Sequence, residues 1–403
     1  GMEGLLCVLD EPGRALHPKD KQGVIRMIEE LKNRGNTVVL IEHDLSFLDH
    51  ADHVIEMGPG GGKNGGQIIY SGSPEPAVEK YRSELPGLFN AFRKKETFKQ
   101  HMELKHLSAN NLDIDGLRLP TAAVTIISGV SGSGKSSLLT QTIAASVRAG
   151  RPVNCLEFSG MPAWDDLLWM EQKEFGAGIM STPLTLTGLW GELKKIFIRH
   201  AAKPGNEPSS RMKLSQKKSV CPECRGTGIV RISMDFLADI EMTCETCRGL
   251  RYRPQILEYR LKGLNLGEIL QMTVDEALPF FEVFREFAAK LDLFKEAGLS
   301  YLALGQPGSH LSSGEIQRLM LIETLLEKSK NNRNKLILLD EPSAGLHYTD
   351  AVKIYRILQR LRDSGHTIIA TEHHPVFTTL ADYRILLGPG AGPNGGRLLS
   401  HGV

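Results

Sequence analysis

A phosphate-binding loop is the feature that most restricts how this chain can fold. Residues 127–139 read ISGVSGSGKSSLL, and the apolar run VTIIS leads into them from residue 124. The spacing of Gly129, Gly134, Lys135 and Ser136 is that of a P-loop, whose backbone amides and lysine surround phosphate oxygens. Such a loop lies between a buried strand and a helix N-terminus, so the motif predicts an α/β fold. The residues expected to bind the phosphates or Mg²⁺ are Gly129, Ser131, Gly132, Ser133, Gly134, Lys135, Ser136 and Ser137.

A second apolar strand is predicted at residues 335–341, where KLILLDE ends in two carboxylates. Continuously apolar strands are typical of a parallel sheet that is buried on both faces. Downstream of a P-loop, Asp340 is expected to help hold Mg²⁺. Glu341 is expected to orient or polarise the water that attacks the terminal phosphate, which makes it a candidate catalytic residue.

Between these two strands, HLSSGEIQRL at residues 310–319 predicts the start of a helix. A helix start offers backbone amides and a hydroxyl to an anion, although an ordinary capped helix has a similar sequence. The order of motifs favours anion binding, because the P-loop is followed by SSGE, then LLDE, then TEH at residues 371–373. The residues expected to contact nucleotide here are Ser312, Ser313, Gly314 and Glu315.

Part of the chain is repeated at a constant offset of 330 residues. LDEPGRALHPKD begins at Leu9, and LDEPSAGLHYTD begins at Leu339. The same offset aligns IEHD with TEHH and GPGGGKNGG with GPGAGPNGG, and about two positions in five are identical over more than sixty residues. We therefore expect two copies of one module, the first without its front half. Asp10, Glu11 and His43 then correspond to residues of the second copy but have no P-loop of their own, so a structural role is expected for them.

Four of the six cysteines form two CxxC pairs that are separated by nineteen residues. Two pairs at this spacing can place four thiolates around one tetrahedral Zn²⁺, and the glycines after each pair permit tight turns. The expected ligands are Cys221, Cys224, Cys244 and Cys247, in a zinc-binding insertion at about residues 215–253.

The order of motifs resembles that of the ATP-binding-cassette ATPases. The resemblance implies a signature at residues 311–315, a D-loop at residues 343–347 and an H-loop histidine, His373, that contacts the γ-phosphate or the water it positions. It also implies that Gln172, in LLWMEQKEF, is the Q-loop glutamine that joins Mg²⁺ to the rest of the cassette.

A zinc module between the P-loop and the signature of a tandem cassette resembles the UvrA family of bacterial nucleotide excision repair. The stretches RYRPQILEYRLKGLNLGEILQMTVDEALPFF, from residue 251, and GLSYLALGQPGSHLSSGEIQRL, from residue 298, carry this resemblance. It implies an ABC-type cassette with a helical signature subdomain, and an ATPase that couples ATP, Mg²⁺ and Zn²⁺ to DNA binding and damage recognition. The implied domains are the rear half of a first cassette (residues 1–72), a linker (73–102) and a complete second cassette (103–403).

Some positions depart from the family pattern. Ser313 stands where the signature usually has glycine, the first D-loop reads GRALH, and the arginines usual after the Q-loop are missing. We therefore expect a divergent paralogue that corresponds to the C-terminal half of the family's architecture. Such a chain would complete its ATP sites either with a separate N-terminal half or as a homodimer. Coupling to a UvrB-like protein stays open. The alternative functions are an ATP-binding-cassette ATPase of transport or resistance and a catalytically idle fragment.

Composition limits the partners of the chain. No run approaches the roughly 18 apolar residues of a membrane span, so we expect a cytoplasmic protein with no membrane partner. The net charge of +1 means that DNA contacts need a local basic patch. The candidate residues flank the cysteine pairs; they are Arg211, Lys213, Lys217, Lys218, Arg225, Arg231, Arg248, Arg251 and Arg253.

Overall fold

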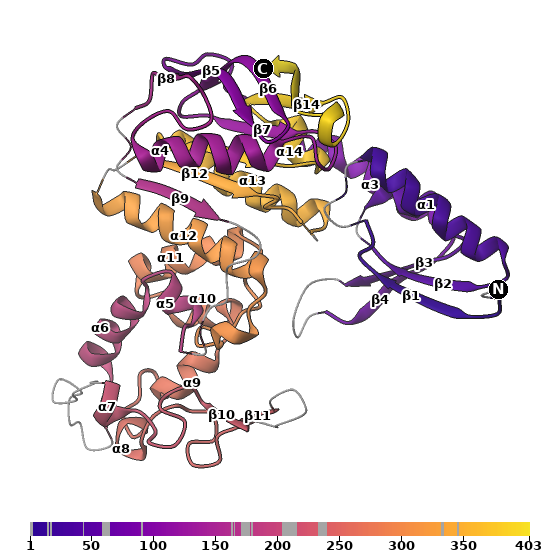
Figure 1. Cartoon of the computed structure of the whole chain (residues 1–403). Coiled ribbons are helices and arrows are strands. Elements are labelled where there is room, and N and C mark those ends of the chain that lie inside the picture. The colour runs from indigo at the N-terminus through magenta and orange to yellow at the C-terminus, as the bar shows by residue number, and fades with distance from the viewer. Residues whose placement is uncertain are drawn as a thin grey trace. The chain divides into compact units, whose positions relative to one another are not determined.

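The computed structural model describes the chain apart from residues 1–2, 14–15, 17, 43, 59–64, 90–91, 163, 165, 171–177, 179, 204–215, 233–239, 332–333 and 345. The chain forms two compact units (Figure 1). Unit 1 comprises Gly1–Lys173 and Glu327–Val403, and unit 2 comprises Glu174–Leu326.

A six-stranded sheet organises unit 1, with the strand order β15-β14-β7-β13-β12-β9. All neighbouring pairs are parallel except β14 with β15, and the central strands are buried because they are apolar along their whole length. The α/β fold expected from the P-loop is confirmed. The strands are β7 (Val124–Ser128), β9 (Asp166–Met170), β12 (Lys335–Asp340), β13 (Thr367–Thr371), β14 (Tyr383–Gly388) and β15 (Arg397–Gly402).

Helices and a second sheet pack against this central sheet. Helix α13 (Tyr348–Asp363) contacts β7 and β13, and α14 (Pro375–Leu380) contacts β7. The helix after the P-loop starts with π-helical turns at Ser137–Ala144 and continues as α4 (Ala145–Ala149). The second sheet has the order β6-β5-β8, and its buried side chains share one apolar core with β7, β12 and β14. Its strands are β5 (His101–Ala109), β6 (Leu112–Pro120) and β8 (Glu157–Ser159).

The repeat seen in the sequence is also a structural repeat. Helix α1 (Pro18–Asn33) corresponds residue for residue to α13, and β2 (Thr37–Ile41) corresponds to β13. The register of β1 (Leu6–Asp10) with β2 equals that of β12 with β13. Strands β3 (Val54–Gly58) and β4 (Gln67–Gly72) pair like β14 and β15, with the bulge at the equivalent position. A short helix, α2 (Leu45–Leu48), lies between β2 and β3 in the sequence.

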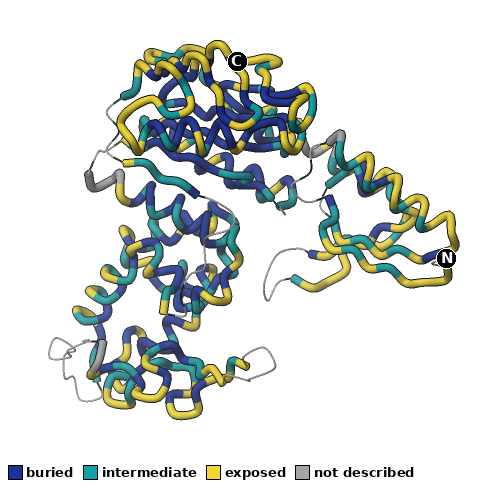
Figure 2. The backbone as a smooth tube through the Cα atoms, in the orientation of Figure 1, coloured by how far each residue is buried: buried dark blue, intermediate teal, exposed yellow. Residues whose placement is uncertain are grey.

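The first copy differs from the second in its burial. In the second copy β7 lies between β13 and β14, whereas β1–β2 and β3–β4 form two separate two-stranded sheets. Leu6 and Val8 are 68% and 61% exposed, but their equivalents Leu336 and Leu338 are fully buried. Figure 2 shows this contrast as yellow and teal strands in the first copy and dark blue strands in the second. Helix α3 (Pro74–Phe89) follows the first copy, within the stretch expected as a linker.

Unit 2 is largely helical and carries a small hairpin of β10 (Ile229–Ile232) and β11 (Ile240–Thr243). Helices α9 and α10 begin at capping boxes, in which Asn265 and Thr273 exchange hydrogen bonds with glutamates three residues later. Its helices are α5 (Pro183–Leu186), α6 (Trp190–His200), α7 (Gln216–Ser219), α8 (Pro254–Leu257), α9 (Leu266–Gln271), α10 (Val274–Phe280) and α11 (Arg285–Glu296), followed by α12 (Ser313–Asn331), which runs into unit 1. Among the described residues, no helix combines the length and apolarity that a membrane crossing requires.

Candidate nucleotide site and cysteine cluster

The P-loop leaves the end of β7 and enters the helix that begins at Ser137, as its sequence predicts. Gly129 has φ +147°, and a Cβ there would lie 2.3 Å from the carbonyl oxygen of Leu387, so a larger residue would push the loop off β14. Ser131 and Ser136 are exposed, whereas the hydroxyl of Ser133 is buried without a hydrogen-bond partner among the described residues. The loop thus combines accessible hydroxyl groups with an unsatisfied buried one.

Lys135 lies inside its own loop and is only 9% exposed. Its ammonium donates to the carbonyl oxygens of Gly129 (2.8 Å) and Val130 (3.1 Å). Burial lowers the pKa of Lys135, while the nearby carboxylates of Glu341 and Asp340 act in the opposite direction. The charge is therefore poorly solvated, and an anion such as a phosphate would compensate it well.

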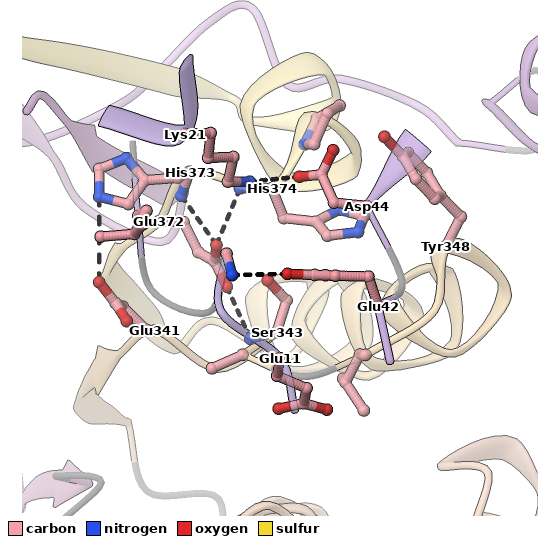
Figure 3. Close-up of a pocket in the computed structure, with 15 residues that line it drawn as sticks. Glu11, Lys21, Glu42, Asp44, Glu341, Ser343, Tyr348, Glu372, His373 and His374 are labelled. Atoms are coloured by element: carbon pink, nitrogen blue, oxygen red, sulfur yellow. Dashed lines mark hydrogen bonds and ion pairs between the residues drawn. The ribbon is translucent and has the colours of Figure 1, made fainter. Parts of the chain in front are cut away.

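The acidic end of β12 lies beside the end of β13. Asp340 accepts a hydrogen bond from the Thr371 hydroxyl at 2.6 Å, which fixes one carboxylate oxygen. Glu341 has φ +46°, and its amide donates to the carbonyl oxygen of Thr371 at 3.1 Å. Its carboxylate lies 3.9 Å from Nε2 of His373, whose side chain is 8% exposed (Figure 3). Three of the residues expected to act on nucleotide are therefore neighbours.

Glu372 organises this region, although the sequence interpretation gave it no role. It is 2% exposed and accepts hydrogen bonds from the amides of Ser343 (2.6 Å), His373 (2.8 Å) and His374 (3.0 Å). Burial raises the pKa of Glu372, and these amides act against that effect. The first copy of the repeat contains the same contact, because Glu42 accepts the equivalent bond from the Gly13 amide at 2.6 Å.

Two further residues contact the P-loop without having been expected there. Asn111 donates to the carbonyl oxygens of Gly132 (2.9 Å) and Gly392 (3.0 Å), which ties the loop to the segment after β14. Asp20, from the first copy, accepts a long bond from the Ser131 amide at 3.4 Å. Asn111 lies in the sequence ANNL at residues 109–112, but its role depends on a tertiary contact that no local pattern reveals.

A small cavity of about 80 Å³ has walls from both copies of the repeat (Figure 3). Equivalent residues line it in pairs, such as Glu11 with Glu341 and Asp44 with His374. Asp44 forms an ion pair with Lys21, and this partner lowers the pKa of Asp44 although burial acts to raise it. The cavity is well below the roughly 300 Å³ of a small-molecule pocket, so it is not itself a nucleotide pocket.

The signature residues form a capped helix start in unit 2. The Ser312 amide donates to Glu315 at 2.7 Å, and the Glu315 amide donates to the Ser312 hydroxyl at 3.3 Å. Glu315 also accepts a hydrogen bond from the Tyr301 hydroxyl at 2.5 Å. Ser313 and Gly314 are half-buried, and a Cβ on Gly314 would meet no atom within 4 Å. Glu315 is thus already engaged within its own helix start.

Gln172 and His43 lie outside the described residues, as do Arg211 and Lys213 of the basic set. Lys218, Arg225, Arg231 and Arg248 are exposed on the surface of unit 2, whereas Arg251 and Arg253 are half-buried. Arg231 lies 3.6 Å from the carboxylate of Glu241. Its charge is therefore partly compensated within the protein.

The four expected zinc ligands lie together in unit 2, all buried, with every Sγ within 4.8 Å of the others. Cys221 and Cys244 are 3.8 Å apart, and Cys224 and Cys247 are 3.6 Å apart. A tetrahedral zinc with Zn–S bonds of ~2.3 Å separates its sulfurs by about 3.8 Å, so the cluster fits this metal. Burial raises the pKa of Cys247 to about 12, a cost that a bound cation would remove.

The central sheet carries the P-loop, Glu341 and His373 at neighbouring strand ends. A helical unit is inserted in the sequence between the P-loop and the acidic strand. This arrangement is that of an ATP-binding cassette. RNase-L Inhibitor shares this fold, with a TM-score of 0.50 at 17% identity over 98% of this chain and 60% of that one. UvrA2 from Deinococcus radiodurans is much more similar, with a TM-score of 0.83 at 35% identity, covering all of this chain and 50% of that one.

Curated relatives match the whole chain. UvrABC system protein A of Pseudomonas aeruginosa is 36% identical over 422 residues, and that of Thermus thermophilus is 37% identical over 421 residues. Over its whole length the chain is therefore UvrA-like. It spans 44% of the length of each of these two relatives. No protein-family model matches the chain.

Proposed function

We propose that this chain is an ATPase of UvrA type that couples ATP binding and hydrolysis to DNA binding and damage recognition in nucleotide excision repair. The observation that carries the proposal is the grouping of three side chains. Glu341 lies 3.9 Å from His373, and its carboxylate also acts electrostatically on Lys135. An acid, a histidine and a buried lysine at adjacent strand ends suit phosphoryl transfer to water.

The residues take the following roles in this proposal. Lys135 and the amides of Ser131–Ser136 bind the phosphates of ATP. Ser136 and Asp340, together with Gln172, hold Mg²⁺, which supplies charge neutralisation at the phosphates. Glu341 orients the attacking water, and His373 contacts the γ-phosphate or that water. Glu372 keeps the backbone before His373 in place through its three amide bonds.

The proposed domains are the rear half of a first cassette (residues 1–72), a linker (73–102) and a second cassette (103–403). In cassette ATPases a signature from another cassette covers the nucleotide on the P-loop. The present 403 residues contain one P-loop and one signature, so we propose that a second polypeptide or a second copy completes the site. The exposed apolar strands β1 and β2 support an additional partner for the first copy.

The direct test measures ATP hydrolysis per chain over a wide range of protein concentration, with and without ultraviolet-damaged duplex DNA. A rate per chain that rises with concentration and increases further with damaged DNA is expected for pairing of two copies. A rate at background under all conditions, also after addition of a separate N-terminal half, would contradict the proposal. Hydrolysis that does not respond to DNA would instead favour an ATPase of transport or resistance.

A further inference from the structure

A cavity of about 430 Å³ lies in unit 2, between the first cysteine pair and the helices α5, α6 and α9. This volume falls within the ~300–1,000 Å³ of small-molecule sites. None of its described lining residues belongs to the P-loop, the signature or the acidic strand end, so the cavity is separate from the proposed ATP site. Its described lining residues are Met180, Thr182, Thr185, Trp190, Val220, Cys221, Pro222, Arg225, Gly226, Arg251, Tyr252, Arg253 and Leu270.

Three arginines bring positive charge to the cavity, and one of them, Arg251, also interacts electrostatically with Cys224 and Cys247. Arg225, Arg251 and Arg253 line it, and no aspartate or glutamate is found among the described lining residues. None of the three guanidinium groups forms an ion pair with a described residue. Arg251 donates to the carbonyl oxygen of Gly305, but Nε of Arg253 is buried without a described hydrogen-bond partner. Unpaired guanidinium donors of this kind suit an oxyanion, above all a phosphate.

The cysteine cluster fixes the position of these arginines. The Cys221 amide donates to the carbonyl oxygen of Arg251 at 2.8 Å, and the Arg253 amide donates to that of Ser219 at 2.9 Å. Val220 and Tyr252 form an antiparallel bridge between these two bonds. The backbone that carries Arg251 and Arg253 is therefore fixed before a ligand arrives, and the bond to Gly305 also holds the Arg251 guanidinium, which reduces the entropic cost of binding.

Aromatic side chains complete the cavity. Tyr252 is only 8% exposed, and its hydroxyl forms no hydrogen bond with any described residue. Trp190, at the start of α6, is half-buried in the same lining. A nucleobase stacks favourably on such side chains, and the Tyr252 hydroxyl can form a hydrogen bond with a polar ligand atom.

We propose that this cavity binds one nucleotide unit, with its phosphate on the arginines and its base against Trp190 and Tyr252. The site goes beyond the proposed ATPase, because it uses none of the P-loop residues. Two sources supply the same chemistry, a free mononucleotide and a nucleotide of a single DNA strand.

The test uses the full chain with its metal bound and follows the fluorescence of Trp190. Trp164 and Trp169 are changed to Phe, which leaves Trp190 as the one tryptophan of the chain. Thymidine 5′-monophosphate is expected to quench the fluorescence of Trp190 saturably. Inorganic phosphate and thymidine are expected to bind at least tenfold more weakly. Lys135→Ala is expected to leave this affinity unchanged, so the result is independent of the proposed ATP site.

The two cysteine knuckles offer a matched pair of variants. Arg225 and Arg248 each follow the second cysteine of a pair, with φ +53° and +51°, and both are exposed, but Arg248 does not appear in the cavity lining. Arg225→Gln is expected to weaken thymidine monophosphate binding about tenfold, the effect of losing one charge-assisted hydrogen bond. Arg248→Gln removes the same charge and is expected to have no effect, with zinc content as the folding check.

An oligothymidylate of eight nucleotides distinguishes the sources. Tighter binding of the oligomer, weakened by Arg225→Gln and not by Arg248→Gln, assigns the cavity to a DNA strand. Binding of the mononucleotide alone assigns it to a free ligand. Equal affinity for phosphate and mononucleotide, equal loss in both arginine variants, or no quenching at all would each overturn the proposal.

Discussion

Nε2 of His373 lies 3.9 Å from a carboxylate oxygen of Glu341, across the ends of two adjacent parallel strands. The pairing of β12 with β13 brings these residues together although they are far apart in sequence. Both side chains are largely buried, at 8% and 17% exposure, so their interaction is weakly screened by solvent.

Replacing the carboxylate tests its proposed role in hydrolysis. Glu341→Gln keeps the side-chain shape but cannot accept a proton or hold a water as an anion does. We expect the hydrolysis rate to fall at least ~100-fold, while the dissociation constant for ATP stays within about twofold. Steady-state hydrolysis and nucleotide-binding titrations measure the two quantities.

Glu11→Gln is the matched control, because Glu11 occupies the equivalent position in the first copy, which has no P-loop here. It is expected to retain full turnover. Normal turnover in Glu341→Gln would show that another group activates the water.

His374 makes the stability of unit 1 dependent on pH. Burial lowers its pKa to about 4, with Lys21 and His347 acting in the same direction and Asp44 against them. Between pH 6.5 and 4 the unfolded chain binds a proton that the folded chain does not, so the free energy of unfolding falls as the pH falls. His374 thereby lowers the free energy of unfolding by about 3 kcal/mol between pH 6.5 and pH 4.

The same histidine caps α14, because its Nδ1 accepts a hydrogen bond from the Val376 amide at 3.2 Å. Protonation of Nδ1 would break this cap. His374→Asn keeps a cap acceptor but does not titrate, so we expect it to flatten the pH dependence between pH 6.5 and 4. Chemical denaturation at several pH values measures this, and an unchanged slope in the variant would assign the dependence to other groups.

The sequence predicted those parts of the fold and site whose signals are local. The P-loop, the apolar strand before Asp340 and the CxxC pairs each combine a residue pattern with its own structural context. The exact offset of the repeat also predicted that α1 and β2 have equivalents in α13 and β13.

Residues that act through tertiary contacts could not be predicted in this way. Glu372 has its role because β13 ends beside the turn that follows β12, and Asn111 because a hairpin tip meets the P-loop. The exposure of Leu6 and Val8 was equally hidden, since their sequence reads as a buried strand. These side chains are exposed because, among the described elements, no strand pairs with the β1–β2 sheet as β7 pairs with β13 in the second copy.

Metal removal tests the cysteine cluster. We expect about one zinc per chain, measured by elemental analysis, and a lower melting temperature for unit 2 after chelation, since structural zinc contributes directly to folding. Cys224→Ser is expected to lose the metal, whereas Cys155→Ser, at a half-buried cysteine outside the cluster, should keep it. Full zinc content in Cys224→Ser would show that the metal binds elsewhere.

The repeat contains one ion pair twice, buried in one copy and exposed in the other. Arg362 and Asp382 lie 2.7 Å apart at 6% and 0% exposure, and the equivalent Lys32 and Asp52 lie 2.6 Å apart at 49% and 74%. Asp382→Asn leaves a buried guanidinium without its main counter-charge, so we expect a loss of about 3 kcal/mol in the free energy of unfolding. Asp52→Asn should cost less than about 1 kcal/mol, because solvent already screens that pair. Equal losses in the two variants, measured by chemical denaturation, would show that burial does not determine the strength of this pair.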